Sequence, residues 1–176
     1  MDEAPLVAKL MAETSRRAHI GPMAAVAGVI ADLAVDAIVK EGASVAVVEN
    51  GGEAALYSDR SLIVSVGAGD NPLSERIGFR ITSFPCGIAT SSGRHSHAFS
   101  MGDADSVTVF AANAGLADAV ATYAANRVKG LEGSDVFSGV EAALRIKGVY
   151  GVLAIRDDRV ATGGVLPEIV SVEATH

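Results

Sequence analysis

The sequence is poor in aromatic residues and in cations. Aromatic residues make up 5% of the 176 residues and Trp is absent, while 21 acidic residues against 14 Lys and Arg give a net charge of −7. Single-stranded nucleic acids bind aromatic stacking platforms, and duplexes need a cationic surface that releases counterions. The composition therefore argues against nucleic acid as a partner.

Cysteine and long uncharged runs are also scarce. The one cysteine, Cys86, excludes an intrachain disulfide and fits a reducing compartment. The start, "MDEAPLVAKLMAETSRR", lacks the basic and then apolar order of a secretory signal. The most apolar stretch, residues 21–40, carries Asp32 and Asp36, so we expect a buried helix and no membrane span. Together these features predict a cytoplasmic protein.

Apolar residues, by contrast, are abundant. They make up 49% of the chain against 20% charged residues, far from the signature of disorder. A chain of this length can bury one sizeable core, and no repeat or linker interrupts it. We therefore predict a single domain over residues 1–176, with a core of Ala, Val, Ile and Leu.

Hydrophobic periodicity predicts helices and short strands. Capping signals accompany the helices, with Gly42 after the second, Asn113 before the third, Lys129 and Gly130 at the end of the third, and Ser134 before the fourth. The helices are expected over residues 5–18, 23–40, 113–130 and 134–148. The strands are expected over residues 44–49, 54–58, 61–68, 76–84, 86–92 and 105–112, with a C-terminal hairpin over 149–164.

Turn chemistry indicates how these strands pair. Asn50-Gly51-Gly52 and Asp157-Asp158 are typical of tight hairpin turns, which join antiparallel strands. Helices and strands are intermixed without strict βαβ alternation. The pattern predicts an α+β fold with a mixed, largely antiparallel sheet packed against helices.

The stretch "PCGIATSSGRHSHAF", residues 85–99, concentrates reactive side chains. Cys86 is either a nucleophile or an inert buried thiol; no activating base can be assigned to it, which favours the inert thiol. His95 and His97 would point the same way on a strand and form an H-x-H zinc pair. No further ligand stands at a zinc-motif spacing, so the zinc reading is the weaker one.

A catalytic triad and an anion site are two further possibilities in this region. A Ser-His-Asp set built from Ser91 or Ser92 with His95 and Asp103 lacks the G-x-S-x-G elbow of such enzymes. The segment from Thr90 to Gly93 and the turn at Asn50 offer backbone N–H groups to an anion, although such segments are usually simple turns.

Asp118 and Thr122 form a candidate cation site. They stand four residues apart on one face of a predicted helix, where a carboxylate and a hydroxyl can meet one hard cation. The alternative is that an aspartate in the first turns of a helix only complements the helix dipole.

Four ordered segments resemble the ApbE family, the FAD-dependent protein FMN transferases. "VTVFAANAGLADAVAT" resembles that family's strand and A-D-A-x-A-T helix, "VVENGGEAAL" its N-x-G-G-D turn, and "GIATSSG" its G-V-A-T-S-G. Upstream, "AAVAGVIADLAVDAIVKEGA" is similar to the helix that begins G-G-I-A-K-G. The resemblance covers roughly residues 22–128, and four ordered matches are far more specific than one.

The chain is most similar to a functionally uncharacterised branch of the ApbE-like superfamily. "IGPMAAVAGVIAD" and "ATGGVLPEIV" match that branch, which extends the similarity almost end to end. Membership implies a T-fold-like sheet. Relatives in the branch generally begin with further strands before the "PLVAKLMAE" helix, so we expect this chain to lack those N-terminal strands.

The resemblance also implies a ligand site. In the transferases the helix Asp and Thr bind magnesium together with a backbone carbonyl, roles that fall here on Asp118, Thr122 and Ala27. A flavin or other nucleotide, such as FAD, is implied near two backbone segments, with His97 as a candidate acid or base. These segments are Asn50, Gly51, Gly52 and Glu53, and Thr90, Ser91, Ser92 and Gly93.

Departures from the family pattern leave two classes of function open. Gly28 stands where the transferases have a Lys, and "RHSHAFSMGDADS" replaces their H-I-I-D-P-x-T-G motif, so FMN transfer itself is not expected. The first class is a magnesium-dependent transferase acting on a flavin or nucleotide phosphate. The second is a non-catalytic binding or accessory protein, associated with sulfur amino-acid (homocysteine) metabolism. An H-x-H zinc hydrolase ranks third, and a homodimer that covers an exposed sheet edge is the expected assembly.

Overall fold

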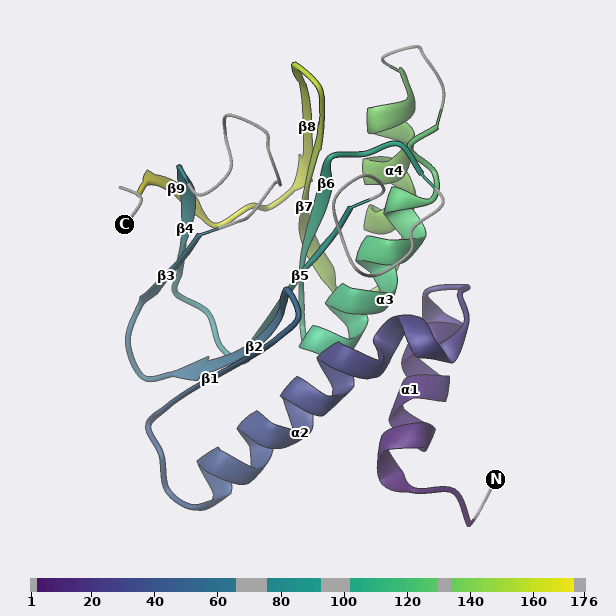
Figure 1. Cartoon of the computed structure of the whole chain (residues 1–176). Helices are drawn as coiled ribbons and strands as arrows, with labels where there is room; N and C mark the ends of the chain where they lie inside the picture. Colours follow the sequence, from purple (N-terminus) through teal and green to yellow (C-terminus); the bar gives the residue numbers. More distant parts are fainter. Residues whose placement is uncertain (1–2, 66–75, 93–101, 130–133, 173–176) are drawn as a thin grey trace.

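A computed structural model gives the structure of the chain and describes residues 3–65, 76–92, 102–129 and 134–172 (Figure 1). The helices are α1 (Leu6–Arg17), the short 3-10 helix η1 (Pro22–Ala25), α2 (Val26–Lys40), α3 (Ala114–Ala125) and α4 (Ser134–Leu144). The strands are β1 (Val45–Asn50), β2 (Glu53–Ser58), β3 (Leu62–Ser65), β4 (Ile77–Ile81), β5 (Cys86–Ser91), β6 (Ser106–Ala111), β7 (Val149–Arg156), β8 (Arg159–Gly164) and β9 (Glu168–Ser171).

The described strands form two sheets. Six strands lie in the order β1-β2-β5-β6-β7-β8 and three in the order β3-β4-β9, and every pairing between them is antiparallel. Figure 1 shows α2, α3 and α4 on one face of the large sheet and the small sheet on the other face. The predicted α+β fold with antiparallel pairing is confirmed.

Alternation along each strand divides the core between the two faces of the large sheet. On β6, Val107 and Val109 pack toward the helices. Phe110 points the other way and meets Phe79 of the small sheet, with ring centroids 4.8 Å apart. Val107, Val109 and Ala111 belong to the same core cluster, on the helix-facing side of the sheet.

The β1–β2 hairpin forms as its turn residues predict. Asn50 pairs with Glu53, and Gly51 and Gly52 between them have φ values of 74° and 108°. Two consecutive residues in this left-handed region match the turn that suits the twist of antiparallel strands, and glycine adopts it without a Cβ penalty. The turn therefore fixes the register that places Asn50 and Glu53 side by side.

Helix α3 begins where predicted and ends earlier. The Leu116 N–H donates to Asn113 Oδ1 at 2.8 Å, which confirms the N-cap. The last helical residue is Ala125, so the predicted end at Lys129 and Gly130 is wrong. After Ala125 the N–H groups of Arg127 and Val128 donate to the carbonyls three residues back, as in a 3-10 turn. The Val128 carbonyl then accepts from the Asp103 N–H at 2.7 Å, a residue outside the helix.

Two further element boundaries differ from the prediction. Helix α4 ends at Leu144 although residues 134–148 were expected to be helical, and the Ile146 N–H turns back to the Ala143 carbonyl. Strand β4 ends at Ile81, and residues 82–84 lead into Pro85, which has no N–H to donate to a ladder.

Helix α2 is buried on one face only, so the expectation of a buried helix is half correct. Val29, Ala31 and Val35 are buried, whereas Ile30 and Ile38 are 47% and 41% exposed. With η1, residues 22–40 are long and apolar enough to cross a membrane by length and composition. This is weak evidence, since the helix packs on α3, β1 and β2 as a core helix does.

Candidate functional site

The candidate site is built where α2 crosses α3. A Cβ atom at Gly28 would collide with the Ala114 carbonyl, and one at Gly115 would lie 2.6 Å from Val29 Cγ2. Two glycines at the contact point therefore let the helix backbones approach closely. A lysine such as the transferases carry in this segment would not fit at residue 28 of this crossing.

Each helix uses an aspartate of the other as its N-terminal cap. The Ala114 and Gly115 N–H groups of α3 donate to the two carboxylate oxygens of Asp32 on α2, both at 2.8 Å. In return, the Gly28 N–H of α2 donates to Asp118 Oδ2 on α3 at 3.0 Å. These N–H groups have no partner within their own helix, and the helix dipole favours a negative charge beside them.

The β1–β2 hairpin brings a second carboxyl group, that of Glu53, near Asp118. Strand alternation turns Asn50 and Glu53 toward the helices, as it does Val48 and Ala55. Asn50 Nδ2 donates to the Ala27 carbonyl at 3.2 Å. The site therefore joins residues from α2, α3, β1 and β2.

Both carboxyl groups hold protons more tightly than in water. Burial raises the pKa of Asp118 to about 6, although hydrogen bonds from the Gly28 and Ala27 backbone offset part of that rise. Burial, and after it the charge of Asp118, raise the pKa of Glu53 to about 8. The effect of the Asp118 charge on Glu53 indicates that the two carboxyls lie near each other, where a bound cation would offset their charge.

The donor set fits magnesium. Asp118, Glu53, the Ala27 carbonyl and the Asn50 side-chain carbonyl are hard oxygen donors, and Thr122 stands one helical turn beyond Asp118. Within the described ranges no cluster of three or more His, Cys, Asp or Glu residues is found. Magnesium commonly takes one or two carboxylates and completes its shell with phosphate and water, so two carboxylates suffice.

The predicted phosphate segments divide between the two faces of the sheet. The Thr90 hydroxyl lies 2.9 Å from that of Thr108 on the face turned toward the small sheet, away from Asp118. Ser91 alternates to the helix-facing side and is buried. The Thr90 backbone approaches the turn, and its carbonyl would lie 3.8 Å from a Cβ atom at Gly52.

The Asn50 to Glu53 turn offers fewer anion donors than predicted. The Gly52 N–H donates to the Glu49 carboxylate at 2.7 Å, so a carboxylate of the chain already occupies that donor. Gly93, His95 and the candidate acid or base His97 lie outside the described residues, and so does any zinc pair of the two histidines.

Sequence reasoning missed the role of Asp32. It treated Asp32 only as an argument against a membrane span, yet both oxygens of this carboxylate hold the first turn of α3. The available signal was an aspartate four residues after Gly28, which mirrors Asp118 four residues after Ala114.

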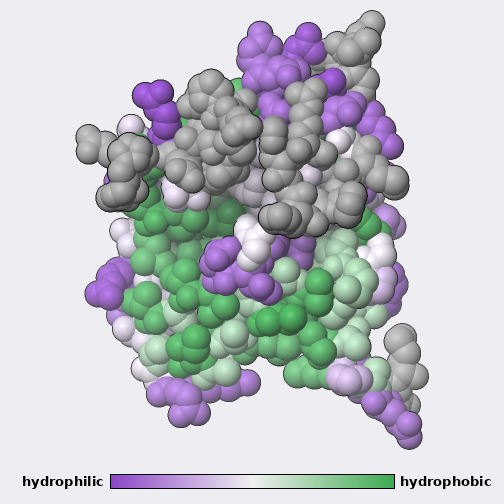
Figure 2. All heavy atoms as spheres, in the orientation of Figure 1, coloured by the Kyte–Doolittle hydropathy of each residue, from purple (hydrophilic) through white to green (hydrophobic). Residues whose placement is uncertain are grey.

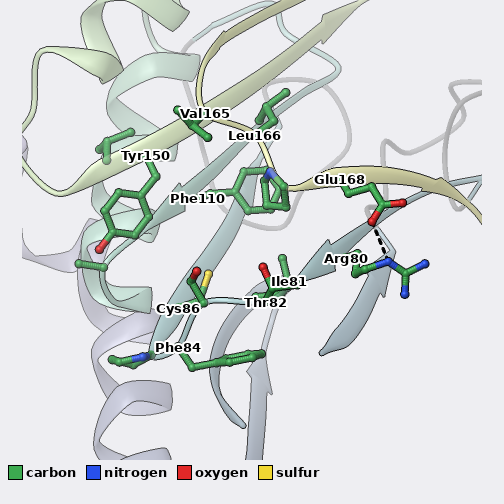
Figure 3. A pocket seen from close by; sticks show the side chains of 15 residues that line it. Arg80, Ile81, Thr82, Phe84, Cys86, Phe110, Tyr150, Val165, Leu166 and Glu168 are labelled. Carbon is green, nitrogen blue, oxygen red and sulfur yellow. Dashed lines mark hydrogen bonds and ion pairs between the residues drawn. The ribbon is translucent and has the colours of Figure 1, made fainter. Parts of the chain in front are cut away.

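A separate apolar hollow lies between the two sheets, at the end of β5 opposite to Thr90 (Figure 3). Its volume is about 930 Å³, Phe84, Phe110 and Tyr150 lie along it, and an Arg80–Glu168 ion pair of 2.8 Å borders it. Cys86 also lines this hollow, and burial raises the pKa of its thiol to about 11. A protonated, buried thiol fits the expected inert role.

The antiparallel sheet backed by helices is the fold that solved ApbE proteins also have. A family model described as "AbpE bacteria" matches residues 1–137, and the chain belongs to this family. The expected membership of an ApbE-like branch is confirmed.

Curated relatives match almost the whole length of the chain. The UPF0280 protein of Methanothermobacter thermautotrophicus is 39% identical over 176 residues, which cover 97% of this chain and 68% of that protein. The UPF0280 protein MK0206 of Methanopyrus kandleri is 42% identical over 184 residues, covering 97% of this chain and 70% of that protein.

Solved structures of ApbE proteins have the same fold. The ApbE protein of Thermotoga maritima superposes with a TM-score of 0.57 at 18% identity, covering 88% of this chain and 51% of that one. The flavin transferase ApbE of Vibrio cholerae, as an H257G mutant, gives a TM-score of 0.54 at 22% identity, covering 82% and 47%. The chain thus spans about half the length of these neighbours.

Proposed function

We propose that the chain binds magnesium together with the phosphate of a flavin or other nucleotide at the α2–α3 crossing. The observation that carries this proposal is the approach of a half-buried carboxyl, Glu53, to the buried carboxyl of Asp118, beside the Ala27 and Gly28 backbone. Burial is the main cause of their raised pKa values, and a bound cation would favour the charged forms that burial disfavours. Sites of this kind are typical of cation binding.

Each residue has a distinct part in this proposal. Asp118 and Glu53 supply carboxylate oxygens, and Thr122 adds a hydroxyl from the next turn of α3. Asn50 holds the Ala27 carbonyl in place through its amide. The bound ion would offset the charge of a phosphate group and orient it.

Support for a flavin or nucleotide comes from the family. The Vibrio cholerae neighbour is named a flavin transferase, and the chain keeps the helix aspartate and threonine and the hairpin turn of that family. FMN transfer is not part of the proposal, because Gly28 replaces the family lysine.

A non-catalytic binding or accessory role is the second candidate. The specific observation in its favour is the Gly52 N–H, which donates to Glu49 and is not free for a phosphate. The link to sulfur amino-acid (homocysteine) metabolism stays a proposal by association. Both candidates use the magnesium-dependent ligand site, and only the first converts the bound ligand into a product.

Calorimetric titration tests the shared site. FAD, FMN and ATP are titrated with and without Mg²⁺ into the wild type and into Asp118→Asn. We expect binding that needs Mg²⁺ and is lost in the variant. Asp36→Asn is the matched control, since Asp36 is exposed on α2 and lies outside the site. A folded wild type that binds none of the three ligands contradicts the proposal.

Incubation of each ligand that binds separates the two candidates. Chromatography detects any product that is released, with Asp118→Asn as the control. A released product identifies an enzyme. A ligand recovered intact identifies a binding protein.

We also propose a cytoplasmic homodimer. Strand β1 ends the strand order of the large sheet, and its Val47 is 51% exposed. Figure 2 shows apolar side chains gathered over the lower part of the molecule, where α2 and the β1–β2 hairpin lie. Pairing of two copies along β1 would cover this edge. Light scattering should give a dimer mass that Val47→Lys converts to a monomer mass, and a monomeric wild type contradicts the proposal.

A further inference from the structure

Basic side chains gather around a second hollow, on the helical side of the molecule. The hollow has a volume of about 560 Å³, and no acidic residue is among the described residues that line it. This concentration stands out in a chain with a net charge of −7. Its basic lining residues, here named the basic cleft, are Arg17, His19, Arg127, Arg145 and Lys147.

Three helix ends meet at the basic cleft. Arg17 is the last residue of α1, Arg127 follows the end of α3 by two residues, and Arg145 follows α4 directly. Cations near helix C-termini have a plain explanation, because they complement the negative end of each helix dipole. The helix dipoles explain the whole cluster only if their negative charge equals the positive charge of the side chains.

The charges do not cancel. Each helix C-terminus is equivalent to roughly −0.5 charge, so three ends supply about −1.5. Arg17, Arg127, Arg145 and Lys147 carry four positive charges. Glu141 lies 3.8 Å from Arg145, but both side chains are exposed, and such pairs contribute little. Even with Glu141 counted in full, about +1.5 remains in the cleft.

Two of the arginines are already fixed in position. The Arg127 guanidinium stacks on the Tyr123 ring, 3.6 Å from its centroid, and Arg127 Nη1 donates to the Tyr123 carbonyl at 3.3 Å. Arg17 Nη2 donates to the Lys147 carbonyl at 2.6 Å. Held guanidinium groups lose less side-chain entropy when a ligand binds.

His19 closes the C-terminus of α1. Its φ of 54° is the left-handed conformation of a helix end, where the Ile20 N–H donates to the Ser15 carbonyl at 3.0 Å and the His19 N–H to the Arg16 carbonyl at 3.3 Å. The His19 ring lies 6.4 Å from that of Tyr123, so this helix end brings an imidazole to the edge of the cleft.

We infer that the basic cleft binds a small phosphorylated molecule with at least two negative charges. Guanidinium groups pair with phosphate oxygens in bidentate geometry, and a hollow of this size is in the range of small-ligand sites. An extended polyanion is a poor fit, because the chain as a whole carries a net charge of −7. The site is separate from the magnesium site and stands whether or not that site exists.

Pyrophosphate in EDTA is the probe. Without a divalent cation the carboxyls of the α2–α3 crossing repel it, so calorimetry at low salt reports the cleft alone. We expect one site, a tenfold or greater loss of affinity in Arg17→Gln/Arg127→Gln, and a decline with added salt. Arg60→Gln/Arg159→Gln is the matched control, with the same charge change at exposed positions elsewhere.

A second variant tests the cleft even if Arg17→Gln/Arg127→Gln does not fold. Arg145 and Lys147 are exposed, and Arg145→Gln/Lys147→Gln should fold like the wild type while it weakens pyrophosphate binding about fivefold. Asp118→Asn should bind pyrophosphate in EDTA as the wild type does, which keeps this site apart from the proposed function.

Three outcomes overturn the inference. The first is a wild type that binds no pyrophosphate, and the second is a control that loses as much affinity as the cleft variants. The third is tighter binding of an acidic peptide such as hexaglutamate, which would identify a protein partner and not a small phosphorylated molecule.

Discussion

Asp32 and Asp118 perform the same local task at the two ends of one helix crossing, and their surroundings differ. Both accept N–H groups from the first turn of the opposite helix. Asp32 uses both oxygens in this way, and the charge near it is the exposed Asp36 on its own helix. Asp118 faces Glu53 from the β1–β2 hairpin and lies beside the backbone of Ala27.

A structural carboxylate and a ligand site differ in the number of oxygens that surround them. A cap needs one carboxylate and two N–H groups, and both ends of the crossing provide that arrangement. A cation site needs further oxygens near the same point, and in the described part of the chain the hairpin brings the Glu53 carboxyl near Asp118. The contrast predicts that changes at the crossing affect both ends, whereas changes at Glu53 or Thr122 affect one.

Substitution of Gly28 should have the largest effect and should disrupt both ends together. In Gly28→Ala the new methyl would collide with the Ala114 backbone, which cannot give way as a flexible side chain can. We expect a loss of about 3 kcal/mol in the free energy of unfolding, measured with urea. Gly21→Ala is the control, since a Cβ there has nothing within 4 Å. Equal stability of the two variants would mean that the helices do not cross so closely.

The two aspartates should separate stability from binding. Asp118→Asn is expected to weaken Mg²⁺-dependent nucleotide binding at least 30-fold, because it removes a charged ligand from the site. Asp32→Asn should change that affinity less than threefold while it lowers the free energy of unfolding by about 1–2 kcal/mol, since one accepting oxygen becomes a donor. Calorimetry and urea unfolding of both variants check this. If Asp32→Asn lost the ligand as fully as Asp118→Asn, the contrast between the two ends would be wrong.

Glu53 should make stability fall with rising pH. Its pKa is about 8 in the folded chain against 4.5 as a free group, so the folded state binds the proton more tightly. The stabilising contribution is therefore complete below about pH 4.5 and is lost as the pH rises to 8. In EDTA, Glu53→Gln should equal the wild type near pH 5 and exceed it at pH 8.5 by on the order of 2 kcal/mol.

Added Mg²⁺ provides the complementary measurement at Glu53. At pH 8.5 it should stabilise the wild type and stabilise Glu53→Gln much less, as read from urea unfolding. Parallel pH profiles of the two proteins, with and without the ion, would show that Glu53 does not face Asp118.

Local signals were enough to predict the pieces of the site. The Asn113 cap, the positive φ of Gly51 and Gly52, and the glycine after α2 at Gly42, with a φ of 97°, each depend on a few neighbouring residues. The helix and hairpin residues later found around Asp118 were predicted from a resemblance that rests on the same short segments.

The remaining features depend on how distant segments pack. The Thr90 hydroxyl faces away from Asp118 because the helices cover the other face of β5, and no pattern within "GIATSSG" specifies which face they cover. The role of Asp32 requires α3 to cross α2, 82 residues further along the chain. The Gly52 N–H was expected to meet a ligand, yet Glu49 on its own hairpin reaches it first.

Substitution of Thr122 should give the smallest effect on binding. Thr122 stands one turn beyond Asp118 and is half-buried, so Thr122→Val keeps the shape and removes only the hydroxyl. A neutral ligand contributes less than a carboxylate, and we expect about threefold weaker Mg²⁺-dependent binding with stability changed by less than about 0.5 kcal/mol. Thr162→Val, on β8 and outside the site, is the control. A variant that binds as the wild type does would restrict the cation site to the carboxylates and the Ala27 carbonyl, because α3 would then present Asp118 alone.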